Sequence, residues 1–133
     1  MRLRLSERAL IRLDAVFDAG LAVFLLAASW DRLYEVLGLP VPEPAFYAQL
    51  LGVALLAIAL IEWATAGKPG QLEVSRMVAA GNLLAAAILT VWLAAGQSGA
   101  DTHGEVILWS IAASLALEAV LHGRAWLPGR SRR

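Results

Sequence analysis

Residues 8–30 read RALIRLDAVFDAGLAVFLLAASW, and this stretch decides what kind of protein the chain is. It is long and apolar enough to cross a bilayer, since about 20 apolar residues span the hydrocarbon core. Yet Arg12, Asp14 and Asp18 lie in its first half, where each charge is penalised by about 2.5 to 3.5 kcal/mol on insertion scales. The stretch therefore predicts a membrane helix whose charged side chains turn toward neighbouring helices.

The composition of the whole chain also indicates a membrane protein. Hydrophobic residues make up 59% of the 133 residues, above the usual share in a soluble domain, and they come in long blocks. The formal net charge is zero, so no basic field favours nucleic acid as a partner. The absence of cysteine excludes disulfides, thiolate metal sites and dithiol redox chemistry. Two carboxylates inside the first apolar run argue against a cleaved signal peptide.

Four apolar segments reach the length of a membrane span. We expect a single domain, residues 1–133, folded as an all-α antiparallel four-helix transmembrane bundle with spans at residues 10–29, 46–65, 77–96 and 106–122. The segments lack the alternating pattern of a membrane β-barrel. Residues 31–37 predict a short interfacial helix with Leu33, Val36 and Leu37 on one side, capped by Gly38 and followed by a proline-rich link.

Basic residues are concentrated on one side of the predicted membrane. Ten of the 11 basic residues lie before or at the start of the first span, around the link between the second and third spans, or after the fourth span. Only Arg32 lies on the other side. The positive-inside rule then places both termini in the cytoplasm, and we expect a bacterial plasma membrane. The aromatic residues agree with this orientation, because Trp30, Tyr34 and Tyr47 fall at the outer boundary, and Trp63 and Trp126 at the inner one.

Every predicted span carries its most polar side chain in the cytoplasmic half. At a rise of 1.5 Å per residue, Asp14 and Asp18 lie roughly 6 and 12 Å into the hydrocarbon core, and because they are four residues apart they share one helix face. The candidate site for protons or a ligand comprises Arg12, Asp14, Asp18, Glu62, Asn82, Glu118 and His122.

Two polar stripes extend this pattern along the third and fourth spans. The residues recur every four positions: Asn82, Ala86, Thr90 and Ala94 in one span, and Ser110, Ser114, Glu118 and His122 in the other. We expect these stripes to face each other, so that the acids share Arg12, His122 and the amide of Asn82, or take up protons. Small residues should let the helices approach closely at Gly20, Gly52, Ala59 and Gly81.

The polar set has more than one interpretation. It is either a structural plug that fixes the register of the helices or a ligand or ion pocket open to the cytoplasm. A metal centre is disfavoured, because one E-x-x-x-H pair, Glu118 and His122, lacks the paired Glu-x-x-His motifs of di-iron bundles. No metal and no cofactor is therefore predicted.

Several short motifs resemble one known family. They are RLDAV at residues 12–16, VLGLP at residues 36–40 and the pair Gly81 and Asn82. In this order and spacing the chain is similar to a family of small bacterial four-span integral membrane proteins with an RLDA opening, an LLGLP link and an early Asn in the third span. More distantly it resembles the DoxX-like group in size and span number. The resemblance implies the four-span fold and the importance of Asp14 and Asn82, and no activity. Val36 and the extra acid Asp18 depart from the pattern.

Two main functional hypotheses follow. The first is a non-enzymatic accessory or interaction bundle that holds a lipid or an apolar small molecule, with the lipid bilayer and a second copy of the chain or another membrane protein as partners. The alternative is a small proton-coupled transporter in which Asp14, Asp18 and Glu118 exchange protons with a cationic substrate. Small multidrug-resistance exporters use one acid in the first of four spans, in a motif that is absent here. A membrane enzyme is the third option, although no motif places a nucleophile beside a base.

Overall fold

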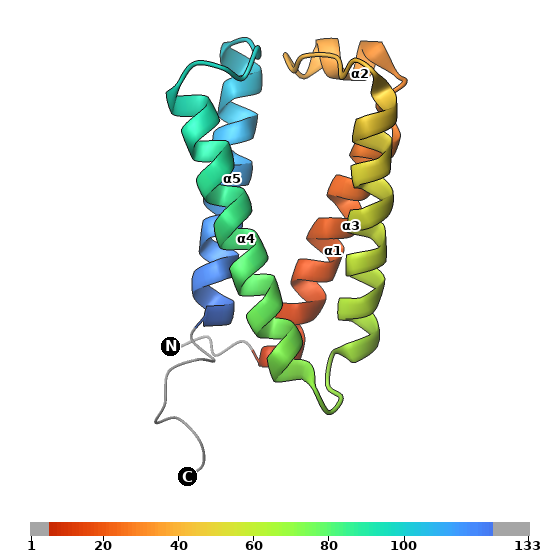
Figure 1. Ribbon diagram of the computed structural model, residues 1–133, viewed down its shortest axis with the longest axis vertical. Helices are drawn as coiled ribbons and strands as arrows, with labels where there is room; N and C mark the ends of the chain where they lie inside the picture. The colour runs from red at the N-terminus through yellow and green to blue at the C-terminus, as the bar shows by residue number, and fades with distance from the viewer. Residues whose placement is uncertain (1–5, 124–133) are drawn as a thin grey trace.

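A computed structural model describes residues 6–123 of the chain, and within this range the protein is helical throughout, with no strand. Trp126 and the basic residues of the two ends, which entered the prediction of orientation, lie outside the described residues. Figure 1 shows four long helices and one short one. They are α1 (Glu7–Leu26), α2 (Asp31–Val36), α3 (Ala45–Thr65), α4 (Gln71–Ala94) and α5 (Thr102–Gly123).

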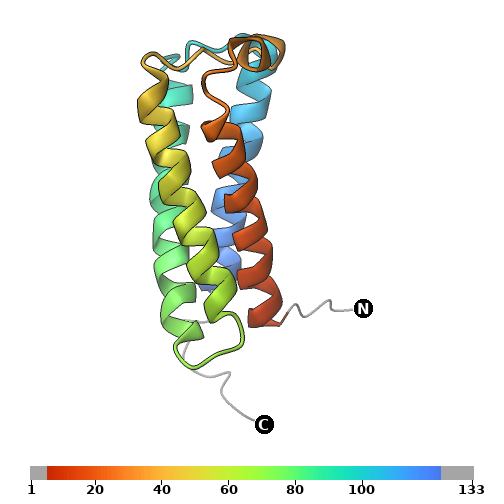
Figure 2. The ribbon, with the colours of Figure 1, turned by 90° about the vertical axis from the view of Figure 1, so that its right-hand side faces the viewer.

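The four long helices run alternately up and down and pack as two pairs. Helix α1 packs along α3 and α4 packs along α5, whereas the two pairs make few contacts with each other. The pairs converge at the end where α1 and α4 begin, which we call the Glu7 end, and they diverge toward the end that carries α2 (Figure 1). Figure 2 shows the molecule from the side of the α1–α3 pair, with α4 and α5 behind it. The all-α prediction is confirmed, but the helices are not spaced evenly around one core.

The outer surface of the helices is apolar. Leu60 and Ile61 of α3 and Leu83 and Leu84 of α4 are each more than half exposed, a pattern that suits lipid and not water. Three helices, α3, α4 and α5, are long and apolar enough to cross a membrane. Helix α1 has a similar length of 20 residues but carries charged residues in its first half.

Small residues set the spacing of the helices within each pair. A Cβ at Gly52 of α3 would lie 2.9 Å from the carbonyl oxygen of Ala22 and 3.1 Å from the backbone nitrogen of Leu26, both on α1. The predicted role of Gly52 and of the buried Ala59 in close packing is therefore confirmed. The same prediction is wrong for Gly20 and Gly81, because both are exposed and a Cβ at either position would lie in open space.

Replacing Gly52 with alanine is expected to weaken the α1–α3 pair, since the new methyl group would meet backbone atoms that cannot rotate away. Overpacking of this kind lowers the free energy of unfolding by about 1–3 kcal/mol. Gly20→Ala is the matched control, because it adds the same methyl group to open space and should raise helix stability by up to about 1 kcal/mol. Unfolding titrations in detergent micelles measure both, and an equal response of the two variants would contradict the packing.

Helices α1, α4 and α5 begin before the predicted spans because polar residues continue them, whereas α1 and α4 end before the predicted spans end. Helix α4 begins at Gln71, after Gly70 in a left-handed conformation (φ 92°), and so includes the polar residues that precede its apolar part. Helix α5 begins at Thr102, where the Asp101 Oδ1 atom accepts a hydrogen bond of 2.9 Å from the Gly104 backbone N–H. A carboxylate at this position satisfies a free N–H of the first turn.

Helix α2 ends as the sequence predicts but packs through a different residue. The N–H of Gly38 (φ 67°) donates to Glu35 and that of Leu39 donates to Tyr34, which is the Schellman termination. Tyr34 is the buried residue of α2, its ring lies 4.7 Å from that of Phe24, and burial raises the pKa of its phenol. Val36, predicted on the packed side, is 71% exposed, because Tyr34 occupies the face that meets α1.

The α2 end also joins the two helix pairs. The backbone N–H of Asp101, in the link before α5, donates a hydrogen bond of 2.9 Å to the Gly38 carbonyl, in the link after α2. A Cβ at Gly104 would overlap that carbonyl group, and a Cβ at Gly99 would lie 3.7 Å from the Cβ of Pro40. The two links are therefore packed backbone against backbone.

Candidate functional site

The buried polar side chains of the described helices gather toward the Glu7 end. Each long helix contributes, with Asp14 and Asp18 from α1, Glu62 from α3, Ser75 from α4 and His122 from α5. Asp14 and Glu62 are each only 1% exposed. Asn82 and Glu118 are partly buried beside them. We call Asp14, Asp18, Glu62, Glu118 and Asn82 together the carboxyl cluster.

Asn82 connects three helices across the gap between the two pairs. Its Nδ2 group donates 3.1 Å to Asp14 Oδ1 on α1 and 3.3 Å to Glu118 Oε2 on α5. The amide supplies two N–H donors, so both are used. The structure thus brings Asp14, Asn82 and Glu118 together, as the two polar faces of the sequence predict.

The other carboxyl oxygens lack hydrogen-bond donors. Among residues 6–123 no donor reaches Asp14 Oδ2 or either oxygen of Glu62, although all three atoms are buried. Asp14 and Glu118 share the Asn82 amide, so their carboxyl groups lie next to each other. Ionised carboxylates only accept hydrogen bonds, so a buried carboxyl group without a donor is favoured in its protonated form. The arrangement therefore suits a cluster that holds protons.

Asp18 lies one turn further along α1 and is 6% exposed. It shares the buried face of α1 with Asp14, four residues away. Four carboxyl groups thus occupy one small buried region. Full ionisation would place several like charges together at low dielectric, where their repulsion is strong.

Arg12 does not contact the carboxyl cluster, so the expectation that the acids share it was wrong. Its guanidinium lies over the ring of Trp63, 5.2 Å from the ring centroid, and its buried Nε has no acceptor within the described residues. Residues two positions apart do not share a helix face, so Arg12 points away from the side of α1 that carries Asp14. The contact with Trp63 is a cation–π interaction.

His122 is held by a residue that the sequence analysis missed. Its Nδ1 atom lies 2.8 Å from Ser75 Oγ of α4, and both residues are 2% exposed. Gln71, Ser75 and Asn82 are spaced by four and seven residues and so share one face of α4. That signal was available, but the predicted span began at residue 77 and excluded the first two.

The polar stripes do not continue toward the α2 end. The hydroxyl groups of Ser110 and Ser114 donate to carbonyls of their own helix, at 2.7 Å and 2.9 Å, and Ser110 and Thr90 are exposed. The predicted facing of the two stripes therefore holds only where Asn82 meets Glu118.

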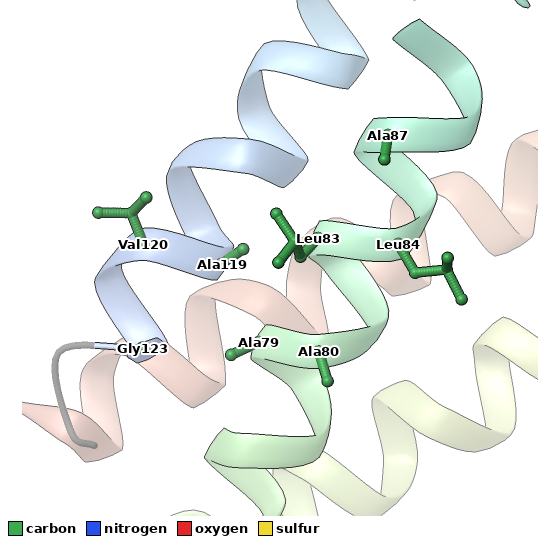
Figure 3. Close-up of a pocket in the computed structure, with 8 residues that line it drawn as sticks. All are labelled: Ala79, Ala80, Leu83, Leu84, Ala87, Ala119, Val120 and Gly123. Atoms are coloured by element: carbon green, nitrogen blue, oxygen red, sulfur yellow. The ribbon is translucent and has the colours of Figure 1, made fainter. Parts of the chain in front are cut away.

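An apolar groove of about 450 Å³ runs between α4 and α5 (Figure 3). Helix α5 contributes Ala119, Val120 and Gly123, and α4 contributes Ala79, Ala80, Leu83, Leu84 and Ala87. None of the cluster side chains lines this groove. Within the described residues, no three His, Cys, Asp or Glu side chains are arranged to hold a metal ion.

Three apolar helices of spanning length define the chain as a helical, multi-pass membrane protein. Comparisons with protein-family models, with curated proteins and with solved structures find no match for it.

Proposed function

We propose that all four long helices span a bacterial plasma membrane, with the Glu7 end and both termini in the cytoplasm. Helix α1 matches the length of the other three, lies antiparallel to α3, and buries both of its membrane acids against neighbouring helices. The basic residues of the described range support the orientation, because Arg8, Arg12, Lys68 and Arg76 lie toward the Glu7 end and Arg32 alone lies at the other. The resemblance to a four-span family supports the same topology.

The function that the geometry favours is proton-coupled binding or transport of a small molecule, without enzymatic activity. One observation carries this proposal: the carboxyl group of Glu62 is buried, with the residue 1% exposed, and neither of its oxygens has a donor within residues 6–123. A buried carboxyl group without a donor is stable only when neutral or beside a cation. Glu62 is closed off from solvent, so a cation larger than a proton can reach it only if the helices move apart. A proton can reach it without such a movement.

Proton release would supply that movement. With protons bound, the carboxyl groups of the cluster are neutral, and Asn82 links the two helix pairs through its hydrogen bonds to Asp14 and Glu118. When the protons leave, up to four like charges repel one another, and the helix pairs have few other contacts to hold them together. The Glu7 end would then open toward the cytoplasm and admit a cationic molecule, which neutralises the acids.

The second candidate is an accessory bundle with no proton exchange. The apolar groove between α4 and α5 favours it, because a groove of about 450 Å³ lined by Ala, Leu, Val and Gly suits one lipid acyl chain. In this case the acids remain protonated and only fix the register of the helices.

Potentiometric titration of the purified protein in detergent separates the two candidates. We expect the wild type to release protons between pH 5 and pH 9, and Glu62→Gln to reduce the number by about one per chain, although coupling spreads the loss over the cluster. Glu35→Gln, at an exposed position in α2, is the matched control, because it makes the same change outside the carboxyl cluster. Equal proton release by the wild type and Glu62→Gln between pH 5 and pH 9 would exclude proton coupling through the cluster.

A further inference from the structure

A column of polar side chains leads from the Glu7 end to the carboxyl cluster. At its exposed start the Gln71 Nε2 group of α4 donates 3.3 Å to Glu7 Oε2 of α1. Ser75 follows Gln71 by one turn and meets His122. His122 in turn follows Glu118 of the cluster by one turn on α5. The column therefore has three layers, and His122 occupies the middle one.

The chemistry of His122 fits this position. Imidazole is the side chain that gains and loses a proton near neutral pH. Glu118 lies one turn from His122 on α5 and shares the Asn82 amide with Asp14 of α1, so the ring lies beside the cluster. Asp14 on α1 and Glu62 on α3 are the buried acids of the neighbouring helices, and the uncharged Ser75 meets the ring from α4.

The alternative explanation is that the hydrogen bond between Ser75 and His122 only stabilises the fold, and this accounts for these two residues alone. It does not account for their place between an exposed polar pair and buried acids whose oxygens lack donors. Ser75 and His122 lie between the Glu7 end and the carboxyl groups of Asp14 and Glu118.

We propose that His122, oriented by Ser75, relays protons between the Glu7 end and the carboxyl cluster. Nδ1 is engaged by Ser75 Oγ, which leaves Nε2 as the nitrogen that exchanges protons with its surroundings. Neutral imidazole takes one proton from a hydronium ion, which becomes water, and the imidazolium passes one proton to a carboxylate of Asp14 or Glu118. The carboxylate becomes a carboxylic acid, and the imidazole returns to its neutral form.

This inference rests on the proposed function, so its test measures the rate of proton uptake separately from the number of protons taken up. Stopped-flow pH jumps with a pH indicator give the rate of proton uptake by the purified wild type and its variants in detergent. We expect His122→Ala to slow proton uptake by the cluster at least 10-fold. In the equilibrium titration this variant should still release the protons that are lost in Glu62→Gln, which we call the Glu62-dependent protons. Ser75→Ala, which removes the positioning residue, should slow uptake several-fold. His103→Ala, an exposed His at the far end of α5, should change neither quantity.

Chemical rescue distinguishes a relay from a structural role. We expect millimolar imidazole in the buffer to restore the rate of His122→Ala, because a small base can enter the space that the ring vacates, and to leave the wild-type rate unchanged. His122→Gln is the second variant, since it fills that space and should stay slow with imidazole present. Wild-type rates in both variants, or a slow His122→Ala that imidazole does not accelerate, would overturn the relay while the Glu62-dependent protons remain. Absence of those protons from the wild type would instead overturn the proposed function.

Discussion

Replacing Asn82 with leucine will destabilise the protein far more at pH 9 than at pH 5. The Asn82 amide is the donor that Asp14 Oδ1 and Glu118 Oε2 share, at 3.1 Å and 3.3 Å. At pH 9 more of the carboxyl groups are ionised and can only accept hydrogen bonds. Leucine removes the amide donor, so these carboxylates then lie next to one another without any donor. At pH 5 a protonated carboxyl group can itself donate to a neighbour, and the loss of the amide matters less.

The expected sizes follow from the strength of such hydrogen bonds. A hydrogen bond to a charged group contributes about 1.5–3 kcal/mol in proteins generally, and side-chain hydrogen bonds between membrane helices average about 0.6 kcal/mol. For two bonds to buried acids we expect the free energy of unfolding to fall by about 2–4 kcal/mol at pH 9 and by about 1 kcal/mol at pH 5. Unfolding titrations in detergent at the two pH values measure the difference.

Two further variants control this experiment. Thr90→Leu makes a similar polar-to-leucine change at an exposed position two turns along α4 and should have little effect at either pH. Combining Asn82→Leu with Asp14→Leu and Glu118→Leu should recover most of the loss, because removing all partners of a buried hydrogen bond is nearly neutral. An equal loss for Asn82→Leu at both pH values would mean that the charge state of the cluster does not change in this range.

The long helices were predictable because each corresponds to one apolar block, but their pairing was not. Large apolar side chains cover most sides of α3, α4 and α5, since such surfaces suit both lipid and neighbouring helices. No single apolar stripe then shows which face packs. The packing depends instead on small residues such as Gly52 and Gly104, whose surroundings only the structure shows. Gly20 and Gly81 look the same in the sequence and pack against nothing.

The acids of the site were predictable from the membrane itself. A carboxylate that faces lipid is unfavourable, so Asp14, Asp18, Glu62 and Glu118 had to turn inward, and the structure buries or partly buries all four. Partners were harder to predict than burial. The expected sharing of Arg12 by the acids fails because residues two positions apart, such as Arg12 and Asp14, point to different sides of a helix.

Introducing cysteines at positions 40 and 99 will produce a disulfide that ties the two helix pairs together at the α2 end. A Cβ at Gly99 would lie 3.7 Å from the Cβ of Pro40, within the 3.5–4.5 Å or so that disulfides require. The chain has no cysteine of its own, so Pro40→Cys with Gly99→Cys gives one defined pair. Oxidation should be nearly complete and visible as a shift in electrophoretic mobility that reductant reverses.

The cross-link should also stabilise the protein strongly. It closes a loop of about 60 residues, for which the chain-entropy model gives about 4 kcal/mol. Gly99 has a φ of 65°, a conformation that costs a residue with a side chain about 1 kcal/mol, so the net gain should be about 3 kcal/mol. The single variants Pro40→Cys and Gly99→Cys measure the cost of each substitution. Failure of the pair to oxidise would contradict the contact between the two links.

The same cross-link shows where the helix pairs move. The proposed opening occurs at the Glu7 end, where the acids repel one another, and the links around Gly38 and Asp101 at the α2 end act as the pivot. A covalent bond at the pivot should leave proton uptake from the Glu7 end unchanged, within about twofold of the reduced form. Oxidation that stops uptake would show that the α2 end moves as well, because a tie at a fixed pivot cannot restrain separation at the other end. The reduced and oxidised forms of one preparation give this comparison directly.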